Sequence, residues 1–159
     1  MTKEILAVGM SLLLALAFAT TTVPEAVAPG AAPTEEQTEQ VHEKRYYLTA
    51  DERELICEVV MAESGTEPYA GKIAVSQCIL NACEQTGKRP AEIVTEYGYT
   101  ARRVKPSAEV EKAVSAVFDD GETVTDAEIL YFYAPELVSS EWHESQTYIC
   151  TIGGHRFFA

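Results

Sequence analysis

Glu63 is the side chain in this sequence that is best placed to do chemistry. It lies four residues after Val59 and three after Val60, on the same face of a predicted helix as Leu55 and Ile56. A carboxyl group directed at an apolar core or cleft is disfavoured in its charged form. The neutral acid can protonate a leaving oxygen, such as that of a glycosidic bond. The alternative is a glutamate that turns to solvent or caps the next helix.

Glu67 is the natural candidate for a second catalytic carboxylate. However, it precedes Pro68 at the start of a predicted helix, and the helix dipole favours an acidic residue there without any catalytic role. The other acidic residues fall on caps, on outward helix faces or in loops, so the sequence offers one convincing cleft carboxylate. Further candidates for substrate contact are Tyr69, Asn81, Tyr97, Tyr99, Tyr133 and His155. For the tyrosines the alternative is a half-buried core position, and for the asparagine and histidine a structural role.

Helices must position these residues in the first part of the domain. Thr49 and Glu52 form a capping-box pattern that begins a helix ending near Glu63. The predicted elements that follow are helices over Pro68–Glu84 and Pro106–Phe118, a helical turn over Ala91–Thr95, a strand over Ile129–Tyr133 and a hairpin over Tyr148–Phe158. In the last part, Trp142 is expected in the core, and His143 and Glu144 in a solvated loop.

Helices followed by a small antiparallel sheet predict an α+β domain. A cleft between the helical lobe and the sheet would be lined by Glu63 and the tyrosines. Residues 46–159 have the size and the regular apolar patterning of one domain.

The amino-terminal part has a different composition. Ile5–Val23 contains no charged residue, and small residues at 26–28 provide a cleavage site, so residues 1–28 are predicted to be a signal peptide. The run is also long enough to be an uncleaved membrane anchor. Residues 29–45 are rich in Pro, Ala, Thr, Glu and Gln and are predicted to be a flexible linker. Both alternatives place the domain outside the cytoplasm.

The net charge excludes some classes of partner, and the cysteine content bears on disulfides and metal sites. The formal net charge of −13 argues against nucleic acid and against anionic lipid as partners of the domain. The four cysteines, at positions 57, 78, 83 and 150, permit two disulfides in an exported protein, or buried free thiols. No spacing typical of a zinc site occurs, so neither metal nor cofactor is expected.

Several short motifs, in order, resemble the spore-cortex-lytic cell-wall hydrolase family (SleB type). They are Leu48–Leu55, Ala62-Glu63, Glu67–Gly71, Ala74-Val75, Leu80-Asn81, Ile129–Tyr133 with Pro135, Trp142, and Ile152–Phe158. The resemblance implies a lysozyme-like helical lobe, peptidoglycan cleavage, and Glu63 as the catalytic acid and base. Positions 65–66, 97–100 and 126–128 differ from the family's usual pattern, which leaves substrate preference open.

These features together predict an exported, monomeric enzyme that acts on peptidoglycan glycan strands. With one carboxylate, the resemblance implies a lytic transglycosylase that cleaves the N-acetylmuramic acid–N-acetylglucosamine bond in spore cortex or in vegetative wall. The alternatives are a muramidase that uses water and a non-catalytic wall-binding module. If Ile5–Val23 is not cleaved, the enzyme would be attached to the membrane.

Overall fold

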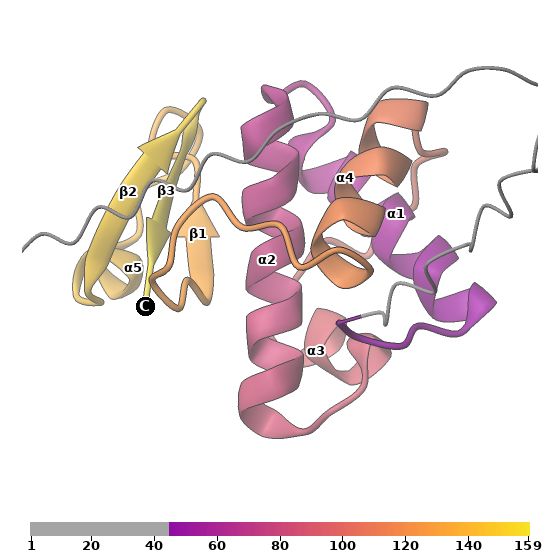
Figure 1. Cartoon of the computed structure of the whole chain (residues 1–159). Helices are drawn as coiled ribbons and strands as arrows, with labels where there is room; N and C mark the ends of the chain where they lie inside the picture. Colours follow the sequence, from indigo (N-terminus) through magenta and orange to yellow (C-terminus); the bar gives the residue numbers. More distant parts are fainter. Residues whose placement is uncertain (1–44) are drawn as a thin grey trace, which may run out of the picture. The chain divides into compact units, whose positions relative to one another are not determined.

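The computed structural model describes residues 45–159. The predicted signal peptide and nearly all of the predicted linker lie outside the described residues. Four helices come first: α1 (Ala50–Ser64), α2 (Tyr69–Thr86), α3 (Pro90–Glu96) and α4 (Ala108–Phe118). β1 (Tyr131–Tyr133), α5 (Glu141–Glu144), β2 (Tyr148–Ile152) and β3 (His155–Phe158) complete the domain, as Figure 1 shows. Within this part of the chain, no helix is long and apolar enough to cross a membrane.

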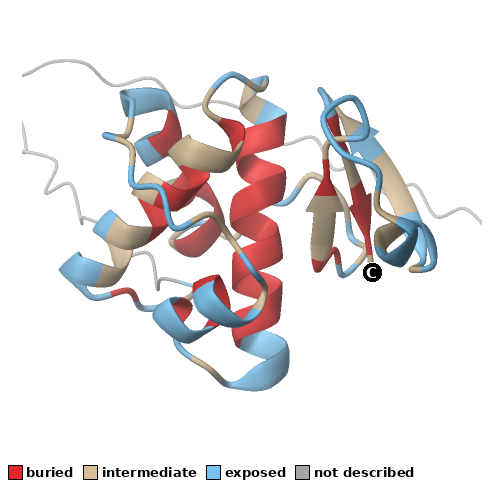
Figure 2. Cartoon of the chain, turned by 180° about the vertical axis from the view of Figure 1, so that it is seen from behind, coloured by how far each residue is buried: buried red, intermediate tan, exposed pale blue. Residues whose placement is uncertain are grey.

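The second helix is the centre of the domain. Every residue of α2 from Gly71 to Cys83 is buried, because α1, α3 and α4 cover one side of the helix and the sheet lies on the other (Figures 1 and 2). A helix that is covered on all sides needs little amphipathic pattern. The sequence therefore predicted the helix, over Pro68–Glu84, but not its burial. It ends two residues later than expected, where Gly87 adopts a left-handed conformation with a φ of 71°.

Buried amides on α2 hold the segment that leads into the sheet. Gln77 Nε2 donates to the carbonyl of Thr125 at 2.9 Å, and Gln77 Oε1 accepts from the amide of Val124 at 3.0 Å. Asn81 Nδ2 donates to the carbonyl of Ile129 at 2.9 Å. Because a buried polar group is costly without a partner, these bonds fix the path of residues 124–129 along the helix and so position β1.

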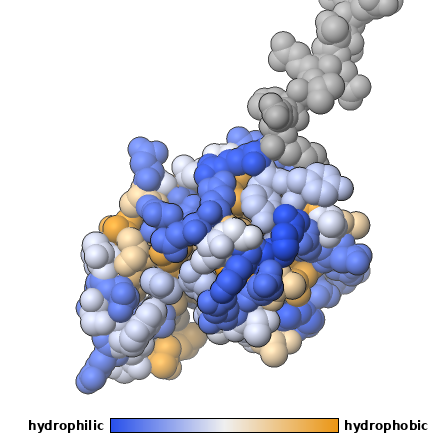
Figure 3. Space-filling view, turned by 90° about the horizontal axis from the view of Figure 1, so that it is seen from below, coloured by the Kyte–Doolittle hydropathy of each residue, from blue (hydrophilic) through white to orange (hydrophobic). Residues whose placement is uncertain are grey.

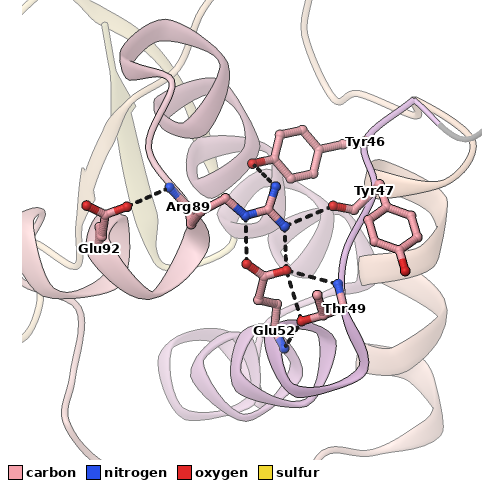
Figure 4. Close-up of polar contacts among 6 residues, drawn as sticks. All are labelled: Tyr46, Tyr47, Thr49, Glu52, Arg89 and Glu92. Carbon is pink, nitrogen blue, oxygen red and sulfur yellow. Dashed lines mark hydrogen bonds and ion pairs between the residues drawn. The ribbon is translucent and has the colours of Figure 1, made fainter.

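The amino-terminal end of the domain is held by Arg89, from the loop between α2 and α3 (Figure 4). Its guanidinium group donates to Glu52 Oε1 at 2.8 Å and to the carbonyl of Tyr47 at 3.1 Å. Glu52 also accepts from the amide of Thr49, which completes the predicted capping box. The hydrogen bond from Arg89 is the main reason that the pKa of Glu52 falls to about 2.

The small sheet is antiparallel with strand order β1-β3-β2. Phe132 of β1 pairs with Phe157 of β3, and Cys150 of β2 pairs with the same residue from the other side. Gly153, with a φ of 58°, makes the turn between β2 and β3. The predicted α+β class, the helical lobe and the carboxyl-terminal hairpin are thus confirmed, although β1 begins two residues later than expected.

The four cysteines are free thiols, three of them buried. Burial raises the pKa of Cys57 and of Cys83 to about 11, so both are held as neutral thiols. A core of this size does not need a disulfide for stability. Hydrophilic side chains cover most of the face seen in Figure 3, with only small separate hydrophobic areas.

Candidate active site

A cleft of about 570 Å³ lies between the helical lobe and the sheet. The end of α1, the end of α3 with the loop that follows it, β1 and α5 all contribute to its walls. The lining residues are Glu63, Glu96, Tyr97, Gly98, Tyr99, Tyr131, Phe132, Trp142 and His143. The volume is in the range of small-molecule binding sites, and aromatic side chains dominate the lining.

Glu63 lies in the last turn of α1 and is partly exposed. Its Oε1 atom accepts a hydrogen bond of 2.7 Å from the backbone amide of Thr100. Its second oxygen makes no hydrogen bond to any residue of the described domain. One oxygen therefore fixes the orientation of the carboxyl group, and the other remains available to a molecule in the cleft.

Tyr99 precedes the residue that holds Glu63. Its ring contacts Phe132, with 5.8 Å between the ring centroids. Its hydroxyl group is buried and makes no hydrogen bond within residues 45–159. Burial, with smaller contributions from Cys78 and Glu63, raises the pKa of this hydroxyl well above its ordinary value. The hydroxyl is therefore a neutral group inside the domain, and the part of Tyr99 that lines the cleft is its ring.

Aromatic rings form one wall of the cleft. Tyr97 stacks on Tyr131 with the ring centroids 5.7 Å apart and an angle of 17° between the planes. The Trp142 ring meets Tyr131 edge-on at 4.9 Å and remains 53% exposed. Large exposed aromatic faces of this kind can pack against the apolar face of a sugar ring.

Glu96 is a second carboxylate in the cleft, which corrects the prediction of a single one. It is the last residue of α3, and its Oε2 atom forms an ion pair with Lys88 Nζ. Sequence reasoning placed Glu96 among the surface acids because its own helix is only seven residues long and carries no clear apolar face.

Glu67 does not line the cleft. Its Oε2 atom accepts a hydrogen bond of 2.8 Å from the amide of Gly154, in the turn between β2 and β3. His155 Nδ1 lies 3.5 Å from Glu67 Oε1 without a hydrogen bond to it. A Cβ atom at Gly153 would come within 1.7 Å of Glu67 Oε2, so the carboxylate occupies the space that a larger residue would need. Glu67 therefore fastens the loop after α1 to the hairpin.

The other residues proposed to bind substrate also lie outside the cleft lining. Asn81 bonds to the chain before β1, and Tyr133 is buried with its hydroxyl group on Glu144. Tyr69 contacts Lys112 through its ring at 5.4 Å, and His155 is buried beside Phe132. Of the candidate residues, the structure brings together Glu63, Tyr97 and Tyr99 in the cleft.

The predictions for Trp142 and His143 were wrong. Trp142 is exposed rather than in the core, and His143 lines the cleft rather than a solvated loop. Both lie on the short helix α5, whose cap is Ser140: its hydroxyl oxygen accepts from the amide of His143 and lies 2.7 Å from His143 Nδ1. Burial lowers the pKa of His143. A serine three residues before the histidine was a capping signal that could have revealed this helix.

A helical lobe and a small sheet that enclose an aromatic cleft, with a glutamic acid at a helix end, are typical of domains that bind and cleave glycans. Comparison with protein families makes this specific: the model of the Cell Wall Hydrolase family matches residues 66–158. The chain belongs to this family and is an enzyme that cleaves peptidoglycan, as the resemblance implied. The matched segment begins three residues after Glu63, so it does not include the proposed catalytic residue. No curated protein matches the chain.

Two solved structures are similar to this chain. One is the catalytic domain of the germination-specific lytic transglycosylase SleB from Bacillus anthracis, with a TM-score of 0.57 and 24% identity over 70% of this chain and 97% of that one. The other is the catalytic domain of the Bacillus cereus SleB protein, with a TM-score of 0.59 and 23% identity over 77% and 99%. These likenesses confirm the fold.

Proposed function

We propose that this enzyme is a lytic transglycosylase that cleaves the bond between N-acetylmuramic acid and N-acetylglucosamine, with Glu63 as the only catalytic acid and base. The observation that carries the proposal is the carboxyl group of Glu63, held by the amide of Thr100 through one oxygen and open to the cleft through the other. The similar Bacillus anthracis domain belongs to a lytic transglycosylase, which supports the same reaction.

The reaction needs one acid and no water. Protonated Glu63 donates its proton to the glycosidic oxygen, and the bond from that oxygen to C1 of the muramic acid breaks. The C6 hydroxyl oxygen of the same sugar forms a new bond to C1, and the carboxylate of Glu63 accepts the hydroxyl proton. The product carries a 1,6-anhydromuramic end, and Glu63 returns to its protonated form.

A muramidase reaction is the second candidate, because Glu96 lines the same cleft. A hydrolase that uses water needs a second carboxylate to activate the water or to attack the sugar. The ion pair with Lys88 argues against this role, since a base must exchange that partner for a water molecule during the reaction. A non-catalytic wall-binding module is the third candidate, and it would have no use for an oriented carboxyl group in the cleft.

The test compares three variants on purified peptidoglycan. We expect Glu63→Gln to lower the cleavage rate by about 10²–10⁴-fold, since it removes the proton donor. Glu54→Gln, the same change at an exposed position of α1, is the matched control and should keep full activity. Glu96→Gln should lower the rate by less than about tenfold. Cleavage by the Glu63 variant at the wild-type rate would refute the assignment.

Mass spectrometry of the fragments separates the two reactions. Anhydromuramic ends, lighter by one water than reducing ends, support the lyase. If all products of the wild-type enzyme have reducing muramic ends, water is the nucleophile and Glu96 is the first residue to examine.

The family's wall substrate also supports action outside the cytoplasm, with residues 1–28 as a signal peptide and residues 29–45 as a linker. Amino-terminal sequencing of the protein from cell fractions tests this. A mature chain that begins near residue 29 is expected, whereas a membrane-bound chain that keeps Ile5–Val23 would indicate an anchor. Sedimentation of residues 45–159 tests the expected monomer. The proposed reaction fits either wall substrate, because spore cortex and vegetative wall both contain the bond that is cleaved.

A further inference from the structure

The loop between α3 and α4 is basic, in a chain that is otherwise acidic. Residues 97–107 contain three basic residues, Arg102, Arg103 and Lys105, and no acidic residue, although the chain has 25 acidic and 12 basic residues. All three side chains are exposed. We propose that this basic loop binds the free carboxylates of the stem peptide on the muramic acid being cleaved, so that the enzyme prefers peptide-bearing glycan; this rests on the proposed function.

The loop begins at the catalytic carboxyl group. The amide of Thr100 is 2.7 Å from Glu63 Oε1, and the Cα atom of Arg102 is at most about 7 Å further along the chain. A sugar bound at Glu63 therefore lies beside the start of this loop, within reach of a long substituent such as a peptide. In peptidoglycan the muramic acid carries a peptide with free carboxylates, so the negative charge arrives with the substrate itself.

The three basic residues have different surroundings. Arg103 donates to the carbonyls of Thr100 and Arg102, at 2.9 and 3.2 Å, and its Nε atom is 3.8 Å from Glu58. This side chain shapes the loop. Arg102 and Lys105 make no side-chain hydrogen bond or ion pair with residues 45–159, so their charges are available to a ligand.

The location of these charges matters because the rest of the protein repels an anionic wall. A local basic loop beside the cleft counteracts that repulsion at the point where the substrate must bind. An arginine is suited to this because its guanidinium group can bind a carboxylate through two parallel hydrogen bonds. The phosphate groups of other wall polymers are the competing anions, but a muramic acid that forms a 1,6-anhydro end must have a free C6 hydroxyl and so carries no polymer there.

The test measures kcat/KM on sacculi and on the same glycan after an amidase has removed the stem peptides. Amide hydrolysis leaves the lactyl carboxylate on each muramic acid, so the comparison isolates the carboxylates of the peptide. We expect the wild type to prefer the peptide-bearing glycan by about three- to tenfold, the effect of one or two exposed ion pairs. Arg102→Gln and Lys105→Gln should each reduce this preference, and together should abolish it while leaving cleavage of the stripped glycan unchanged. Lys112→Gln, an exposed lysine on α4, is the single-charge control and should change nothing.

Three results would overturn the proposal. The first is a wild type without preference, and the second is a pair of variants that lose activity equally on both glycans. The third comes from a binding assay with the Glu63→Gln protein, which should sediment with sacculi without cleaving them. If hydrofluoric acid, which removes phosphate polymers, abolishes this binding and amidase treatment does not, the loop binds phosphate instead. If the wild-type protein binds sacculi in a peptide-dependent way but cleaves no glycan, the proposed role of the basic loop is supported and the proposed function is refuted.

Discussion

Replacing Gly153 by alanine tests whether Glu67 fastens the hairpin to the helical lobe. The new Cβ atom would lie 1.7 Å from Glu67 Oε2 and 2.9 Å from Pro68 Cδ. The carboxylate is the movable partner, so it must leave and give up its hydrogen bond to the amide of Gly154. Alanine at a φ of 58° is also strained.

The magnitude follows from these two costs. Left-handed backbone costs alanine about 1 kcal/mol, and loss of a hydrogen bond to a charged group costs about 2 kcal/mol. We therefore expect Gly153→Ala to destabilise the domain by about 3 kcal/mol, or about 12 °C in the midpoint of thermal unfolding for a domain of about 100 residues. Gly87→Ala is the matched control, because its φ is 71° and nothing lies within 4 Å of its Cβ position. It should cost only about 1 kcal/mol.

Circular dichroism during thermal unfolding measures the loss of stability for Gly153→Ala and for Gly87→Ala. The double variant Glu67→Ala with Gly153→Ala should be more stable than the sum of the two single changes predicts, by about 2 kcal/mol, since the carboxylate that blocks the Cβ atom is gone. If Gly153→Ala costs no more than Gly87→Ala, Glu67 does not hold the turn and the reasoning fails.

Three further predictions concern single side chains. Because the pKa of folded Glu52 lies near 2, below its ordinary value of 4.5, its pair with Arg89 stabilises the fold above about pH 4.5, and this contribution is lost as the pH falls through 2. Arg89→Gln should therefore cost about 1 kcal/mol in urea unfolding at pH 7, after allowance for the half-exposed arginine, and less than about 0.5 kcal/mol at pH 2; an equal cost at both pH values would contradict this. Tyr99→Phe removes a buried hydroxyl that makes no hydrogen bond within residues 45–159, so stability should stay or rise while kcat/KM changes by less than about twofold; a loss of more than about 1 kcal/mol in stability would show that the hydroxyl has a partner in the folded protein. Trp142→Ala should raise KM by about three- to tenfold with little change in stability, and Leu137→Ala, more exposed but outside the cleft lining, should not; equal effects of the two changes would refute the aromatic wall.

The helices were predictable because their signals are local. The capping box at Thr49 and Glu52 and the glycine at position 87 depend only on residues a few positions apart. The helix α5 was missed because four residues are too few for a periodic pattern. The burial of α2 on all sides was not predictable from its own sequence, since it depends on elements that pack from both sides.

The part of the site that depends on the pattern of a single helix was predictable from the sequence. Glu63 was found from the apolar face of its own helix. Glu96, Tyr131 and Trp142 line the same cleft but come from three separate elements, and only the tertiary fold brings them together. Tyr97 and Tyr99 were among the candidates for substrate contact, but the backbone contact of Thr100 with Glu63 joins residues 37 positions apart and was not predictable.

Glu63, in the last turn of α1, and Glu67, in the connection to α2, show how the surroundings of a carboxylate decide its role. Glu63 and Glu67 are four residues apart and have the same chemistry. Glu63 has one backbone donor and faces the cleft, so it can exchange a proton with a bound sugar. Glu67 has one oxygen on the amide of Gly154 and the other beside His155, in a space that the glycines of the turn leave open. It cannot approach the cleft without releasing the hairpin.

If Glu67 nevertheless took part in catalysis, Glu67→Gln, which keeps an acceptor for Gly154, would change the products from anhydro to reducing ends or abolish cleavage in a folded protein. A structural Glu67 predicts anhydro products with a reduced midpoint of unfolding.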